Sequence, residues 1–416
     1  MNPFKEKPMP LDKCVMNWNE IAGKPYNKNE VSPYTKTRII LMNGTEYEAV
    51  WFSHQFSRHC NDNSLRRELC TLRRTEQQQQ KQLAALKPAD ETILETTIGY
   101  EQLAVDLTAY LAQNEKDKNV VKALDFALLE DFDHLYRYAN LLDGQHNIHA
   151  ERLVGGYTEI MPGRPTISHH RCPHDGIPKF TDFNTADLQT KLNVNIITAA
   201  EQQTMNYYMN VGAFYPTEEG RRLYTEIGMI EEQHVSRYGG LIDPNCTWLE
   251  NLLMHEYCEC YLYYSMFNDE TDERIKKVFE QNFYFELAHL HHAAKLIKKY
   301  EGKTWQQVFP CAEFPAPLKL HENKEYVRGV LKNTVYQTAK KEGYCEVSKL
   351  PETAGFFEYQ AKVNPTVGMV ASHNVIENYI KEHGQDYRFE ESENPVKELQ
   401  NRKKDNTTVG RKRCAK

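Results

Sequence analysis

A thirty-residue spacing that occurs three times constrains the fold of this chain more than any other feature. Each time, an acidic residue is followed thirty positions later by an acid-x-x-His sequence (131 − 101, 231 − 201 and 286 − 256). A polar turn lies about halfway, so folding back there returns the second acid to the height of the first. The later acid and the histidine share a helix face. We therefore predict three antiparallel helical hairpins with these sets: Glu101, Asp131, His134; Glu201, Glu231, His234; Glu256, Glu286, His289.

The residues after each histidine are also related, which indicates an internal repeat rather than a chance match. They read HLYRYANLLD, HVSRYGGLID and HLHHAAKLIK, with Arg137, Arg237 and His292 three positions after the histidine. Metal ligands usually need orienting partners. We therefore expect the two arginines to pair with carboxylates near the ligands.

The acid and histidine sets lie in otherwise hydrophobic helices, where a charged group must be exposed, paired or metal-bound. Carboxylates with imidazoles suit iron or manganese better than a closed structural zinc site. Two hairpins would supply four carboxylates and two histidines, which is enough for two metal ions. The alternative is a structural bundle whose polar groups pair between helices.

The sequence leaves open which two hairpins share a site. The residue types favour the second and third hairpins, because both have glutamate at each acidic position whereas the first has Asp131. Chain length favours the first with another, because 67 positions separate His134 from Glu201 (201 − 134) but only 22 separate His234 from Glu256 (256 − 234). The short link favours laying the second and third hairpins side by side. We expect the first and second hairpins to form the site, and the third set to lie at its margin.

The ligand pattern resembles the ferritin-like superfamily of non-haem di-iron or manganese carboxylate proteins, over roughly residues 90–300. The resemblance implies a dinuclear iron or iron–manganese cofactor whose ligands are all nine acid and histidine residues. The chain departs from that pattern in having three hairpins and no Cys-x-x-Cys module. It also has Asp131 where Glu is usual, with Glu130 beside it.

The expected fold is mainly α, a ferritin-like bundle with three ligand-bearing hairpins and small β or irregular terminal segments. The N-terminal segment, 1–88, would hold a β-hairpin about Asn43-Gly44 and an exposed polar helix over 63–86. The metal-binding domain would span 89–305, and an irregular extension 306–416.

Within the extension we expect a strand at 324–330 and a helix near 370–383. The charged tail 390–416 is predicted to be disordered.

Composition excludes several classes of protein. A net charge of −7 over 416 residues argues against a dedicated nucleic-acid binder. No run of about 18 apolar residues predicts a membrane helix, and the N-terminus lacks the apolar core of a signal peptide. Ten cysteines without a regular framework favour reduced thiols and a cytoplasmic protein.

Two further groups of residues are candidates for function. The sequence SHHRCPHDG places His169, His170, Cys172 and His174 together, as a second metal site or a polar surface loop. Paired tyrosines lie seven or eight positions after a ligand glutamate, where they would be redox-active, line a pocket or fill the core: Tyr207, Tyr208, Tyr263, Tyr264.

The leading hypothesis is a di-iron, or iron–manganese, oxidase or oxygenase that uses O2 on a small organic substrate. Rubrerythrin-like peroxide scavenging, metal storage and a structural bundle without catalysis are the alternatives. The expected partners are O2, the substrate and an electron-donor protein, with a homodimer as a candidate assembly. We expect neither nucleic acid nor membrane.

Overall fold

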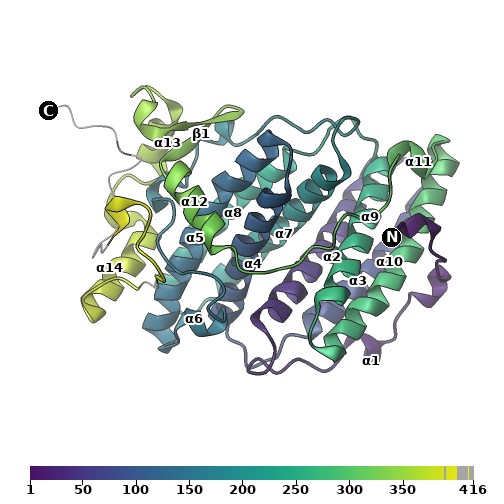
Figure 1. The fold of residues 1–416 in the computed structure, drawn as a ribbon, viewed down its shortest axis with the longest axis horizontal. Coiled ribbons are helices and arrows are strands. Elements are labelled where there is room, and N and C mark those ends of the chain that lie inside the picture. Colours follow the sequence, from purple (N-terminus) through teal and green to yellow (C-terminus); the bar gives the residue numbers. More distant parts are fainter. Residues whose placement is uncertain (388–389, 401–410, 412–416) are drawn as a thin grey trace. The chain divides into compact units, whose positions relative to one another are not determined.

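The computed structural model describes residues 1–387, 390–400 and 411, and these are mainly helical (Figure 1). The chain divides into two compact units whose segments alternate along the sequence, so the expected central domain, 89–305, contributes to both. Unit 1 comprises Met1–Glu91, Asp182–Gln203 and Asp243–Leu320; unit 2 comprises Thr92–Thr181, Thr204–Ile242 and His321–Lys416.

Unit 1 is built on two long helical hairpins, in which α2 packs on α9 and α3 packs on α10. Aspartates cap the second helix of each hairpin, where Asp62 and Asp272 accept hydrogen bonds from the first free backbone N–H groups. The hairpins are α2 (Pro33–His59) with α3 (Asn63–Ala85), and α9 (Trp248–Asp269) with α10 (Glu273–Glu301). The unit also holds η1 (Pro3–Lys5), η2 (Leu11–Lys13), α1 (Trp18–Ile21), α11 (Trp305–Val308) and the first part of α7 (Leu188–Phe214).

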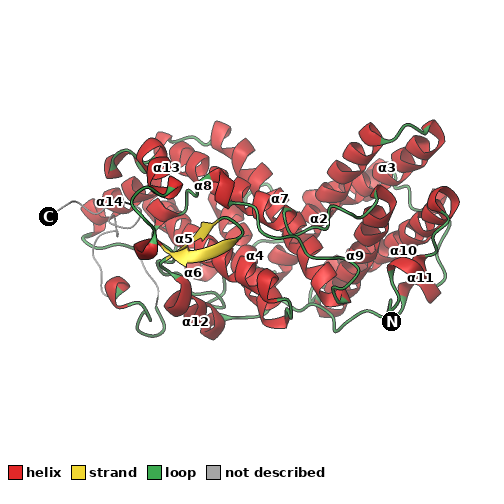
Figure 2. Cartoon of the chain, turned by 90° about the horizontal axis from the view of Figure 1, so that it is seen from above, coloured by secondary structure: helices red, strands yellow, loops and turns green. Residues whose placement is uncertain are grey.

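Unit 2 contains the hairpin α4 (Ile93–Asn114) with α5 (Lys118–His146), on which α8 (Glu218–Gly239) packs. The last part of α7 belongs to this unit, α14 (Ala371–His383) packs on both α5 and α8, and a small β-hairpin is visible in Figure 2. The remaining elements are α6 (Ala150–Leu153), η3 (Thr166–Ser168), η4 (Pro173–Asp175), α12 (Lys324–Thr334), β1 (Gln337–Lys340), β2 (Gly343–Glu346), η5 (Val347–Lys349), α13 (Gly355–Val363), η6 (Val367–Met369), α14 (Ala371–His383) and η7 (Lys397–Leu399).

The long helices repeat with a period of 155 residues. Each helix from α7 to α10 begins 155 positions after its counterpart from α2 to α5 (188 − 33, 218 − 63, 248 − 93 and 273 − 118). The caps follow the same register, since Thr92 and Thr247 (247 − 92) both form capping boxes with a glutamate three residues later. The chain is therefore a tandem duplication of a four-helix half, α2–α5 followed by α7–α10. Each unit draws hairpins from both halves.

The predicted N-terminal β-hairpin is wrong, because its residues lie inside α2. Gly44 makes no turn there. A Cβ at this position would lie 2.7 Å from Nε2 of Gln203, which donates a hydrogen bond to the Ile40 carbonyl at 2.7 Å. Gly44 thus permits the close approach of α7 to α2 within unit 1. Packing overrides the strand preference of the flanking β-branched residues.

The helix expected over 63–86 is present as α3, but it is not simply exposed. It buries one face, which includes Leu69, Leu72, Glu76 and Gln79. Its many polar residues concealed this face, because four of the buried side chains are themselves polar.

The C-terminal segment is more ordered than expected. The strand expected at 324–330 is wrong, since these residues form most of α12. The strands occur at β1 and β2, joined by a turn in which Lys341 has φ 55°. The helix expected near 370–383 is confirmed as α14. Of the tail that we predicted to be disordered, 401–410 and 412–416 lie outside the described residues.

Among the described residues, no helix combines the length and the apolar character needed to cross a membrane. The cysteines in this part of the chain are all free thiols.

Candidate metal centre

Unit 2 brings five of the predicted ligands together from three helices. Glu101 comes from α4, Asp131 and His134 from α5, and Glu231 and His234 from α8. One ligand atom from each of Glu101, Asp131, His134 and Glu231 lies within 4.8 Å of the others, and Asp131, Glu231 and His234 meet the same limit. All five side chains are at most 1% exposed. Asp131 and Glu231 belong to both groups, as carboxylates that bridge two ions would.

The two histidines direct the same ring atom at the shared carboxylates. Nδ1 of His134 lies 2.9 Å from Glu231 Oε1, and Nδ1 of His234 lies 3.2 Å from Asp131 Oδ1 and 3.1 Å from Glu231 Oε2. Apart from these two imidazoles, no group in the described part of the chain donates a hydrogen bond to either oxygen of Asp131 or of Glu231. Buried carboxylate oxygens without donors are costly. A cation between these side chains would satisfy them, so the residues fit a metal pair.

Glu130 orients His234. The Nε2 atom of His234 lies 2.7 Å from Glu130 Oε2, and the Arg171 guanidinium holds both oxygens of Glu130 at 2.7 and 2.6 Å. A proton on Nε2 leaves the Nδ1 lone pair free for a metal, which is how metal-binding histidines are usually fixed. Glu130, which in sequence was only a neighbour of Asp131, is thus an orienting residue.

Charge in the centre is distributed unevenly. Although burial opposes it, Arg171 and His234 hold the pKa of Glu130 well below its ordinary value. Burial raises the pKa of Asp131 despite the nearby His234. Glu130 therefore already has its counter-charge, whereas Asp131 lies where a further positive charge would be stabilising.

Tyr208 contacts the centre directly. Its hydroxyl donates to Glu101 Oε1 at 2.5 Å, and its ring packs against Tyr138 and Tyr224 with centroids 5.4 and 5.6 Å away. Tyr207 instead donates to the Ile93 carbonyl at 3.2 Å. Tyr208 is therefore placed to tune a candidate ligand.

We expect Tyr208→Phe to lower the free energy of unfolding by about 1.5–3 kcal/mol, as for a hydrogen bond to a charged group. Tyr207→Phe is the matched control. It should lower the free energy of unfolding by about 0.5–1.5 kcal/mol, because it removes a hydrogen bond from the Tyr207 hydroxyl to a neutral carbonyl. Urea denaturation of the two variants measures the difference. Equal losses would contradict the assignment of Tyr208 to the ligand Glu101.

The third predicted set lies in unit 1 instead of at the margin of this centre. Glu256, Glu286 and His289 each place a ligand atom within 4.8 Å of Glu76, a residue that the sequence reasoning missed. A signal for it exists. Glu76 follows Glu46 by thirty residues (76 − 46), but Gln79 stands where the other sets have histidine. A fourth hairpin, α2–α3, therefore carries the same spacing.

Glu201 is the ninth predicted ligand, and it lies on α7. It is 1% exposed and falls in the segment of this helix that belongs to unit 1, two residues before that segment ends at Gln203. Its counterpart in the repeat register is Glu46 (201 − 46 = 155).

The residues after the histidines have different partners. Arg137 pairs with Asp133, with Nε 3.0 Å from Oδ2, as expected for an orienting contact. Arg237 has no ion pair with a carboxylate of the described residues, and it donates to the Tyr344 hydroxyl at 2.5 Å. A different arginine, Arg171, contacts the residue that orients a ligand, because its guanidinium donates to both oxygens of Glu130.

The SHHRCPHDG segment is neither a metal cluster nor a simple surface loop. His169 and His170 are buried, and among the described residues no group of candidate metal ligands includes them. The Nε2 atom of His169 bonds to the Arg164 carbonyl at 2.8 Å, and burial lowers the pKa of His169 to about 3. The segment also carries Arg171, whose backbone N–H donates to Gln233 Oε1 at 2.9 Å.

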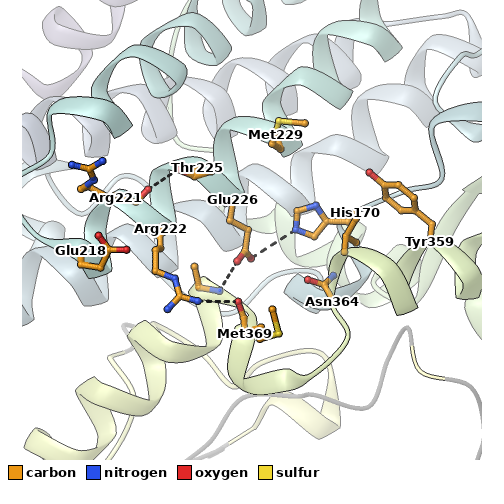
Figure 3. Close-up of a pocket in the computed structure, with 12 residues that line it drawn as sticks. His170, Glu218, Arg221, Arg222, Thr225, Glu226, Met229, Tyr359, Asn364 and Met369 are labelled. Atoms are coloured by element: carbon orange, nitrogen blue, oxygen red, sulfur yellow. Dashed lines mark hydrogen bonds and ion pairs between the residues drawn. The ribbon is translucent and has the colours of Figure 1, made fainter.

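His170 borders a pocket of about 440 Å³ in unit 2 (Figure 3). There Glu226 accepts hydrogen bonds from the start of α14, at 2.6 Å from the Ala371 backbone N–H and 2.7 Å from the Ser372 hydroxyl. Although burial opposes it, His170 and Ser372 lower the pKa of Glu226 to about 2. None of the predicted metal ligands lines this pocket.

Comparison with protein-family models, curated proteins and solved structures gave no match for this chain.

Proposed function

We propose that unit 2 holds a dinuclear non-haem iron or iron–manganese centre of the ferritin-like kind, and that the protein is an oxidase or oxygenase that uses O2. The observation that carries this proposal is the pair of ligand groups sharing Asp131 and Glu231, with one imidazole at each end. Two carboxylates shared between two imidazole-bearing positions are the ligand arrangement that a pair of such ions requires. A reduced metal pair there would supply electrons for the reduction of O2.

The protein's own residues would hold and shield the reacting ions. Glu130 fixes the ring of His234, and the buried tyrosines around Tyr208 keep bulk water from the ligands. The centre is thus a dry site of fixed geometry.

An organic substrate is the proposed electron donor or oxygen acceptor in the leading function. The pocket beside His170 is a candidate for binding it, and its lining carries both cations, Arg221 and Arg222, and acids, Glu218 and Glu226. Peroxide scavenging is the second candidate, because the ligands are buried and none of them lines that pocket. Small oxidants need no such pocket.

Rapid mixing of the iron-loaded, anaerobically reduced protein separates these two functions. An oxygenase or oxidase should consume O2 productively only when its organic substrate is present. We therefore expect little peroxide turnover with reductant alone, and the same low rate in His234→Ala, which lacks one ligand. Fast peroxide turnover that needs no organic substrate and disappears in His234→Ala would favour the scavenger.

A further inference from the structure

Unit 1 contains a second buried cluster of carboxylates, gathered from all four of its long helices. Its ligand atoms form two groups, each within 4.8 Å, that share Glu76. One group adds Glu256, Glu286 and His289, and the other adds Glu46 and Glu259. The second group is composed of carboxylates alone.

Hydrogen bonds hold one side of this cluster. Nε2 of Gln79 donates to Glu46 Oε1 at 3.0 Å and to Glu286 Oε1 at 2.6 Å, and Tyr263 also donates to Glu46 Oε1. Nε2 of His289 lies 2.8 Å from the Thr75 hydroxyl, which leaves Nδ1 turned toward the carboxylates. The polar residues around the cluster therefore fix the orientation of these ligands.

The other side of the cluster receives little from the rest of the described chain. Neither oxygen of Glu259 nor Oε2 of Glu46 has a hydrogen-bond partner there, and Glu76 is contacted by His289, whose Nδ1 lies 2.7 Å from Glu76 Oε1. These three side chains are at most 3% exposed. Within the described part of the chain, His289 is the one cationic partner of the five carboxylates. Burial and the neighbouring Glu76 raise the pKa of Glu259 well above its ordinary value. Unpaired buried carboxylates call for positive charge.

The repeat register shows how this cluster differs from the centre in unit 2. Gln79 stands at the position of His234 (234 − 79 = 155), so one imidazole is replaced by an amide. Glu259 stands at the position of Ala104 (259 − 104 = 155), so one carboxylate is added. Both changes make the ligand set richer in oxygen, which suits harder cations such as Mn²⁺ and Mg²⁺.

We propose that unit 1 holds two divalent cations bridged by Glu76, one of them in an all-carboxylate position that Glu46 and Glu259 complete and that takes a hard cation such as Mn²⁺ or Mg²⁺. Two dications carry four positive charges against five carboxylates, so the buried cluster is nearly neutral when filled. This site is separate from the centre in unit 2 and does not depend on its chemistry.

The test uses the full chain with the centre in unit 2 disabled by Glu231→Gln and His234→Ala. Metal-stripped protein is titrated with Mn²⁺ alone, and bound Mn²⁺ is counted from the loss of the free-ion electron paramagnetic resonance signal. We expect this background to bind Mn²⁺ and to melt at a higher temperature when Mn²⁺ is added. Adding Glu259→Gln or Glu76→Gln should raise the Kd by more than the about 10–100-fold that loss of an outer-shell partner causes.

Both substitutions keep the side-chain shape, and each removes one negative charge from a repulsive cluster. We therefore expect the metal-free variants to melt no lower than the background, which separates loss of binding from loss of folding. The proposal is overturned if the background binds no Mn²⁺, or if Glu259→Gln leaves both the Mn²⁺ count and the Mn²⁺-induced rise in Tm unchanged.

Discussion

Replacement of Asp131 by alanine is expected to abolish the dinuclear signature of the protein. Asp131 belongs to both ligand groups in unit 2, and its oxygens lie beside Nδ1 of His234. Its loss removes a carboxylate shared by the two positions and leaves Glu231 as the one remaining shared ligand. Iron counting and the absorbance of the oxidised, iron-loaded protein measure the effect. We expect the dinuclear absorption to disappear.

Glu286→Ala is the matched control, because Glu286 occupies the same position in the repeat register (286 − 131 = 155). Glu286 lies in the cluster of unit 1, so its loss should leave the dinuclear absorption of unit 2 largely intact. The opposite pattern, with absorption lost in Glu286→Ala and kept in Asp131→Ala, would place the redox-active pair in unit 1.

Much of the helical core could be predicted from the sequence. The hairpins carrying Glu101, Asp131 and Glu231 were recognisable because acids and histidines recur at helical spacing between polar turns. Chain length also favoured a meeting of the first and second hairpins, because the short link between the second and third would need almost full extension to carry the chain back along a bundle. Their meeting is confirmed by the cluster in unit 2, and their role as metal ligands stays a prediction.

The fourth hairpin escaped prediction for two physical reasons. Gln79 replaces the histidine that made the other three sets visible, and Asn43-Gly44 imitates a β-turn inside α2. Equal intervals in the sequence would have revealed the fourth hairpin. Glu101 follows Glu46 by 55 residues (101 − 46), and Glu256 follows Glu201 by the same number (256 − 201). The pairing of hairpins between the two halves depends on contacts between residues far apart in sequence, which no local pattern encodes.

Arg171 and Glu130 were also beyond sequence reasoning, because 41 residues separate them and their partnership exists only in the fold. Arg171 is 1% exposed, and its guanidinium lies beside a carboxylate that is fully buried. Arg171→Leu would leave Glu130 as a buried charge with weaker compensation. We expect the free energy of unfolding to fall by about 3–5 kcal/mol, the usual cost of breaking a buried ion pair from one side.

Glu130→Gln tests the other half of the same pair. It keeps the shape of the side chain but weakens the acceptor for His234 Nε2, so metal affinity should fall by about 10–100-fold. Glu232→Gln, on the less buried side of α8, is the control and should leave the affinity unchanged. In the double variant Arg171→Leu with Glu130→Gln, stability should partly recover, because the buried charge is gone. If the free energy of unfolding of the double variant falls by the sum of the two single decreases, Arg171 acts independently of Glu130. Glu130 would then have to be held in place by a residue other than Arg171.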